Sequence, residues 1–157
     1  MALKWTNKDE VDRAFREFED RYNKKAAEWM CRLGEQVVKY ARENGNYTDR
    51  TANLRNSIGY IVVQSGKVIA DSFKGNTPSK EKGGDVAKAH KMGLDYAKEV
   101  IKDYDGDKTY LVWVAGMEYA AAVEAKGYDV IEGSGNWVES QAKKQMESFK
   151  RFLLSKR

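Results

Sequence analysis

Residues 7–44 read NKDEVDRAFREFEDRYNKKAAEWMCRLGEQVVKYAREN and carry the strongest structural signal in the chain. Apolar side chains recur along it at every third or fourth position: Val11, Phe15, Phe18, Tyr22, Ala26, Trp29, Leu33, Val37 and Tyr40. This spacing puts them on one side of a helix, so the stretch predicts a single long amphipathic helix. Thr6, three residues before Asp9, predicts a capped start, and Gly45 predicts a left-handed cap residue just past the end.

The predicted helix is longer than the globule that the chain can form. At about 1.5 Å per residue it measures roughly 55 Å, whereas a domain of this size has a diameter of roughly 40 Å. We expect the stripe of the C-terminal half to lie on the protein's own sheet: Trp29, Leu33, Val37 and Tyr40. The N-terminal half then overhangs, and we expect a neighbouring subunit to cover Phe15, Phe18 and Tyr22. A bend in the helix is the alternative.

The segments after this helix predict a small sheet. Residues 58–64 and 67–73 are rich in β-formers and are joined by Ser65-Gly66, so they predict a hairpin over residues 58–73. Residues 109–115, TYLVWVA, are almost continuously apolar and predict a third, central strand. Residues 128–131 predict a short fourth strand.

Further helices are expected around the sheet. Apolar spacing predicts a helix over 86–104, a helical turn over 117–125 and a C-terminal helix over 136–155. Residues 74–85, KGNTPSKEKGGD, contain the only proline and predict a mobile loop. The whole chain, residues 1–157, is therefore expected to form a single α+β domain. Its long N-terminal helix packs on a small, mostly antiparallel sheet of about four strands, with a second helix and a C-terminal helix.

The composition excludes several classes of protein. The chain is 41% hydrophobic and 33% charged, which is too apolar for a disordered tail. No run approaches the roughly 18 uncharged apolar residues of a membrane-spanning helix. The first residues run into charges without an apolar core, so they predict no secretory signal. Synthesis in a cytoplasm is therefore expected. A single cysteine, Cys31, excludes an internal disulfide and a multi-cysteine zinc site.

The residues that carry chemistry in enzymes do not form a convincing set. His90 is the only histidine and falls inside a predicted helix, as Cys31 does, so no nucleophile has a base beside it. Residues 103–107, DYDGD, are similar to the opening of a calcium loop, but Lys108 and Val114 occupy positions that need glycine and glutamate. An acidic turn at a helix end is the better interpretation. The sequence thus predicts no enzyme, no cofactor and no metal.

The net charge of +4 is concentrated at the C-terminus. Residues 141–157 hold one acidic residue, Glu147, and six cationic ones: Lys143, Lys144, Lys150, Arg151, Lys156 and Arg157. Such a segment can bind phosphate, although cations at a helix end also complement the helix dipole. A basic nucleic-acid-binding accessory protein is therefore the alternative function.

Two motifs carry a family resemblance. Residues 49–58, DRTANLRNSI, resemble the D-T-G-N-L-R-x-S-I signature that follows the long N-terminal helix of phage tail-completion (head–tail joining) proteins. Residues 119–124, YAAAVE, resemble the Y-A-x-x-V-E segment of the same family, in the same order along the chain. The chain departs from the family at Ala52, where glycine is usual, and over 74–104, which looks like an insertion. The motif residues are the candidate site: Asp49, Thr51, Asn53, Leu54, Arg55, Tyr119, Ala120, Val123 and Glu124.

The resemblance implies an assembly role within the virion. Proteins of this family form a ring, usually six-fold, at the top of the tail. The expected partners are other copies of the chain, head-connector and tail-tube proteins, and DNA that passes through the lumen without sequence-specific binding.

The signature also has a physical interpretation of its own. Thr51 is expected to cap the short turn, Leu54 to enter the core and Arg55 to stay accessible. Asp49 is expected to pair with Arg50 or Arg55. A plain connector between helix and strand is the alternative interpretation.

Overall fold

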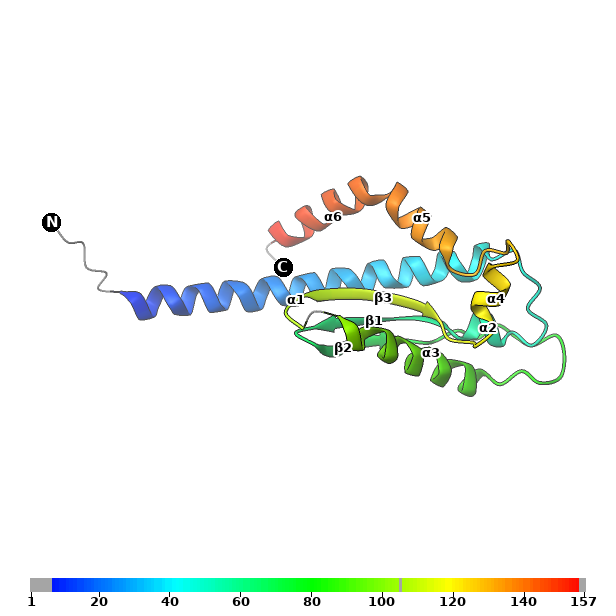
Figure 1. Ribbon diagram of the computed structural model, residues 1–157. Helices are drawn as coiled ribbons and strands as arrows, with labels where there is room; N and C mark the ends of the chain where they lie inside the picture. The colour runs from blue at the N-terminus through cyan, green and yellow to red at the C-terminus, as the bar shows by residue number, and fades with distance from the viewer. Residues whose placement is uncertain (1–6, 105, 156–157) are drawn as a thin grey trace.

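The computed structural model describes residues 7–104 and 106–155. Its first element, α1 (Lys8–Asn44), is one unbroken helix of 37 residues that runs well beyond the rest of the protein (Figure 1). The bend considered above is absent, because the apolar stripe continues past the sheet without a break. Thr6 lies outside the described residues, and Asn7, just before the helix, makes no side-chain cap hydrogen bond.

The end of α1 differs from the expected left-handed cap. Gly45 has φ −60° and ψ 124°, which is extended backbone. A glycine is favoured there for space instead, since a Cβ would lie 2.5 Å from Cε1 of Tyr47 and 3.1 Å from the carbonyl oxygen of Asp129. The chain therefore leaves α1 through a turn in which a side chain at position 45 would clash with its neighbours.

The sheet has three antiparallel strands, β1 (Ile58–Gln64), β2 (Lys67–Ser72) and β3 (Thr109–Ala115), in the order β2-β1-β3. The α+β class is confirmed, but the central strand is β1 and not β3. The residues of β3 are almost all apolar because helices cover both faces of the strand, and not because both of its edges are paired. Leu111 and Trp113 pack on one face, and Val112 and Val114 pack on the other.

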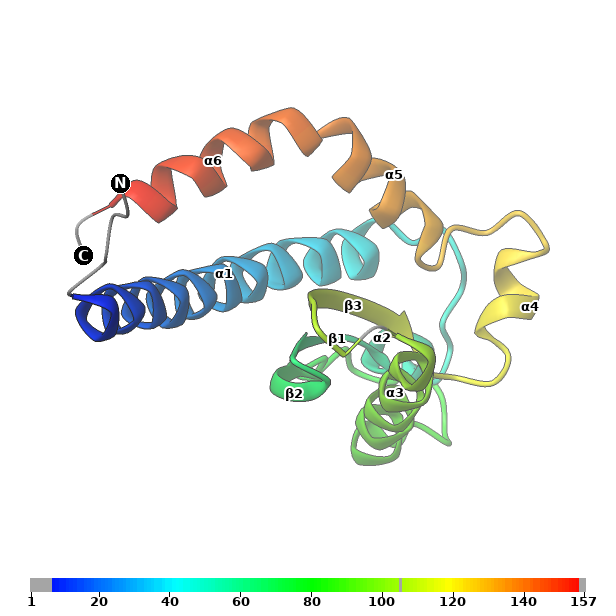
Figure 2. The same ribbon diagram turned by 60° about the vertical axis from the view of Figure 1, so that its left-hand side comes forward.

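Helices cover both faces of the sheet. The C-terminal half of α1 lies on one face and α3 (Val86–Val100) on the other, as Figures 1 and 2 show. The short helix α2 (Asn53–Asn56) leads into β1. The predicted helix over 86–104 ends as a 3-10 turn, η1 (Ile101–Asp103). A three-layer arrangement results, with β1 buried along nearly its whole length.

The expected fourth strand over residues 128–131 is absent. The backbone N–H groups of Val130 and Ile131 point to the carboxylate of Glu124 instead of a neighbouring strand. Val130 is fully buried in the core under α1, so its apolar character reflects burial and not strand pairing. The described residues therefore form a sheet of three strands rather than four.

The C-terminal region is helical but divided. After α4 (Ala120–Glu124), helix α5 (Glu132–Ser140) begins four residues earlier than predicted, and α6 (Ala142–Leu154) follows a break at Gln141. Both helices arch over α1 on the side away from the sheet (Figure 2). Among the described residues, no helix combines the length and the apolar character needed to cross a bilayer.

Aromatic contacts attach α5 and α6 to α1. Trp29 packs on Phe149 with ring centroids 4.8 Å apart, and Tyr40 stacks on Trp137 at 5.4 Å. The ammonium of Lys25 donates to the carbonyls of Phe152 and Leu153, each at 3.2 Å, and so caps the end of α6. Trp29 and Tyr40 therefore face the C-terminal helices and not the sheet, which corrects their expected placement.

Candidate assembly site

The first motif forms a tight turn between α1 and β1. Ala52 has φ 59°, in the left-handed region where glycine is favoured, and its side chain is completely buried. Ala52 and not Thr51 precedes α2, and no side-chain cap is made there. The turn is fixed instead by Asp49, whose Oδ2 accepts a hydrogen bond from the backbone N–H of Arg55 at 2.8 Å. Leu54 enters the core as expected.

Arg55 binds the end of α1. Its guanidinium donates to the carbonyl of Arg42 and to that of Gly45 at 2.8 Å, and it lies 4.6 Å from the ring centre of Tyr47. The last carbonyls of a helix lack partners within the helix and carry partial negative charge, which a cation stabilises. Arg55 is half-buried in this position, so it does not stay accessible as expected.

Arg42 extends the same network to the sheet. It donates to the carbonyl of Ile58, the first residue of β1. Burial lowers the pKa of its guanidinium, and the negative charge of Glu35 opposes that effect. Arginine remains charged because its pKa starts so high. The two arginines thus join the end of α1, the turn and the start of β1.

The asparagines of the first motif hold the segment over residues 74–85. Asn56 donates to the carbonyl of Thr77 at 3.0 Å and accepts from its N–H at 2.8 Å. Asn53 donates to the carbonyl of Gly83 at 3.0 Å and accepts from the N–H of Asp85 at 2.8 Å. The segment has no helix or strand of its own. No pattern in the sequence predicts this role for Asn56, which is buried and lies inside the first motif.

The second motif lies against the first. The pKa of Tyr119 is raised, first by partial burial and then by the negative charge of Asp49, while a hydrogen bond with Thr51 lowers it. Ala120 is buried in the core under α1, and Val123 packs against the same core. The structure thus brings together two motifs that are far apart in the sequence.

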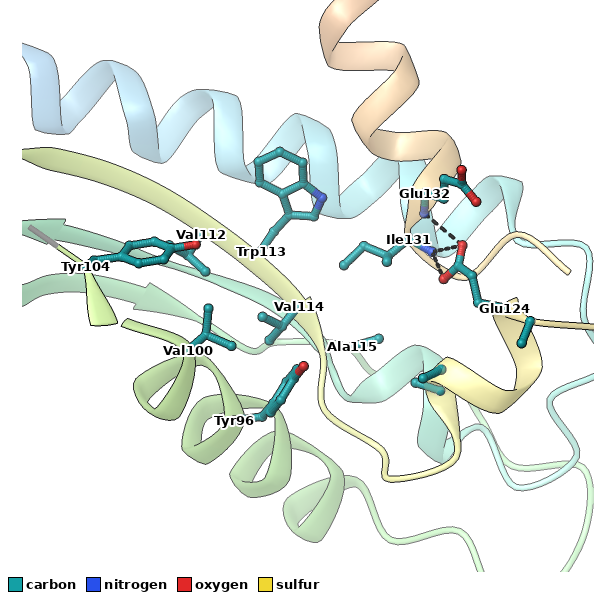
Figure 3. A pocket seen from close by; sticks show the side chains of 13 residues that line it. Tyr96, Val100, Tyr104, Val112, Trp113, Val114, Ala115, Glu124, Ile131 and Glu132 are labelled. Atoms are coloured by element: carbon teal, nitrogen blue, oxygen red, sulfur yellow. Dashed lines mark hydrogen bonds between the residues drawn. The ribbon is translucent and has the colours of Figure 1, made fainter. Parts of the chain in front are cut away.

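Glu124 connects the second motif to α5. Its carboxylate accepts hydrogen bonds from the N–H groups of Ile131 at 3.2 Å and Glu132 at 3.0 Å (Figure 3). A carboxylate is favourable at a helix N-terminus because it satisfies free N–H groups and complements the dipole. The hydrogen bonds of Glu124 therefore position the start of α5.

Residues considered for chemistry have structural partners. Nε2 of His90 lies 2.6 Å from the carbonyl oxygen of Gly75. Burial raises the pKa of the Cys31 thiol, which reduces the reactive thiolate at neutral pH. Within residues 7–104 and 106–155, no group of three His, Cys, Asp or Glu side chains could hold a metal ion. Asp105, in the calcium-like stretch, lies outside the described residues.

The apolar residues at the overhang of α1 are exposed and far from both motifs. Phe15 is 69% exposed, Phe18 58% and Tyr22 42%. Helix α6 reaches Tyr22, whose ring meets that of Phe149 edge-on with the centroids 6.4 Å apart. A cavity of about 220 Å³ lies between Phe18 and Leu154. Exposed apolar residues grouped in this way are typical of interaction surfaces.

Comparison with known proteins identifies the family. A family model described as "Bacteriophage HK97-gp10, putative tail-component" matches residues 9–125. No curated protein and no solved structure matches the chain. The matched residues include α1, the sheet and both motifs, and they end before α5. The chain therefore belongs to the HK97-gp10-like family of bacteriophage tail components.

Proposed function

We propose that this tail component is a structural tail-completion protein that joins head and tail as a ring, with six subunits as the expected number. A tail component is a part of the virion and works through contacts with other virion proteins. The proposed neighbours are other copies of the chain, the head connector and the tail tube, with DNA passing through the lumen. The proposal includes neither catalysis nor a bound cofactor.

The overhang of α1 carries the proposal. It presents Phe15 and Phe18 to solvent, and burying a phenylalanine side chain contributes about 1.5–3 kcal/mol. The overhang and the body of the protein are different surfaces, so a contact between them in two copies is head-to-tail. Head-to-tail contacts generate a ring when the rotation closes. This supports an assembly in which each overhang is covered by the next subunit.

Two substitutions in α1 test the proposal. Phe18→Asp should leave a folded chain that fails to enter particles, because Phe18 is 58% exposed and the charge falls on the proposed assembly surface. Val37→Asp should unfold the chain, because Val37 is 0% exposed and an unpaired buried charge costs several kcal/mol of a total stability of about 5–15 kcal/mol. Circular dichroism measures folding, and complementation of particles lacking the protein measures assembly.

A matched control separates charge from apolar contact. Arg13 lies on the opposite side of the overhang, so Arg13→Asp changes the charge more but should still allow assembly. Normal particles with Phe18→Asp would contradict the proposed surface. Unfolding of the isolated Phe18→Asp chain would show that the side chain is buried in the subunit itself.

A further inference from the structure

The two edges of the sheet differ in their protection against further pairing. The β2 edge carries Lys67 and Asp71, and its register with β1 shifts between Val62 and Val63. Charges and bulges of this kind discourage the addition of another strand. By contrast, β3 has no charge and no proline over seven residues, and its register is regular. Within the described part of the chain, β3 pairs with β1 alone.

The hydrogen-bond phase shows which backbone groups face the open edge of β3. The N–H of Gly116 donates to the carbonyl of Ser57 at 3.3 Å. In an antiparallel pair, residues alternate between bonding the partner strand and facing away from it. Val112 and Val114 therefore bond to β1. Four residues of β3 direct their N–H and C=O groups outward: Thr109, Leu111, Trp113 and Ala115.

A groove of about 590 Å³ follows this edge (Figure 3). Tyr96 and Tyr104 line it on the side of α3, and Ile131 lines it on the side of α5. The charged residues that line it, among those the structure describes, are Glu124 and Glu132. Glu124 binds backbone amides, as described above, whereas Glu132 is exposed. The groove is thus apolar along its length and acidic at one end.

We propose that this groove binds an extended segment of another virion protein, which pairs with β3 as a fourth strand. Strand addition takes its affinity from main-chain hydrogen bonds and its specificity from pockets for alternate side chains. The segment would carry apolar side chains at alternate positions and a lysine or arginine beside Glu132. Helices stand on both sides of the edge, which favours a slender segment over the edge of a second folded sheet. The inference does not depend on the ring or on the overhang.

Amide hydrogen exchange in the intact protein tests the free edge first. The amides of Leu111 and Trp113 should exchange at least about tenfold faster than those of Val112 and Val114, because they lack a partner strand. Equal protection of all four in the dilute monomer would overturn the proposal. Protection that appears only at high concentration would assign the edge to a second copy and equally overturn it.

The second step adds a strand-forming probe, acetyl-Lys-Val-Thr-Val-Thr-Val-Lys-amide, followed by NMR. The probe should protect the amides of Leu111, Trp113 and Ala115, and a version with proline in place of the central valine should not. Ala121→Arg, which fills the groove with a cation, should weaken binding by at least about tenfold. Ala122→Arg adds the same charge beside the groove and should change binding by less than about twofold. No protection at millimolar probe, or equal effects of the two variants, would overturn the proposal.

Discussion

At the scale of single residues, Arg55 has the most consequential contacts. It donates to carbonyls at the end of α1 and covers the ring of Tyr47. The sequence predicted that Leu54 enters the core, since an apolar residue between polar ones has one favourable place to go. The partners of Arg55 could not be predicted, because backbone carbonyls have no signature in the sequence.

Removing Arg55 should therefore destabilise the protein. We expect Arg55→Ala to lower the free energy of unfolding by about 2–3 kcal/mol, because charged hydrogen bonds are lost and carbonyls are left unsatisfied. Arg55→Lys should retain only part of this stabilisation, since an ammonium lacks the planar fork of a guanidinium. Urea unfolding measures both. Arg50→Ala is the control: Arg50 makes an exposed 3.8 Å ion pair with Glu81, which contributes less than about 1 kcal/mol. Equal losses in Arg55→Ala and Arg50→Ala would contradict the role of Arg55.

Among the helices and strands, the sequence predicted the features that depend only on neighbouring residues, such as the hairpin turn. Ser65 and Gly66 both have positive φ, 50° and 72°, as a two-residue hairpin turn requires. The start of α5 was not predictable in the same way. Gly133 and Gly135 disfavour a helix, yet the distant carboxylate of Glu124 caps its first turn. The edge position of β3 likewise could not be predicted, because it depends on which strands pair with one another. The apolar content of a strand does not show this.

The segment over residues 74–85 connects β2 to α3 without a helix or strand of its own. Its mobility remains a prediction, and we expect trypsin to cut the isolated protein there first, after exposed Lys80 or Lys82. Asn53→Ala should speed this cleavage several-fold, because it removes two hydrogen bonds that hold the segment. Gel electrophoresis over time measures the rate. Asn136→Ala, at an exposed site in α5, should leave the rate unchanged. A first cut at Lys67, inside the hairpin, would contradict the expected order.

At the scale of the whole molecule, the positive charge gathers on α6. Lys143, Lys144 and Arg151 are exposed there. We expect weak DNA binding that falls steeply with salt and ignores sequence, because phosphate contacts give affinity without base discrimination. Fluorescence anisotropy at low and physiological salt measures it. Lys143→Gln should reduce the slope of log affinity against log salt by up to about 0.9. A sequence preference that survives physiological salt would favour the nucleic-acid-binding alternative.

The part of α1 that extends beyond the sheet makes the protein a cantilever. The sheet reaches α1 near Asn23, whose carbonyl accepts from Gln64 at 3.3 Å, so the rod from there to Lys8 extends about 22 Å. A tilt of about 5° at the root would move the tip by roughly 2 Å, which is enough to misalign its aromatic side chains with a neighbouring surface. The angular stiffness of the root, where Gln64 binds Asn23 and Phe149 of α6 packs on Tyr22, would therefore set how accurately the tip meets the proposed neighbouring subunit.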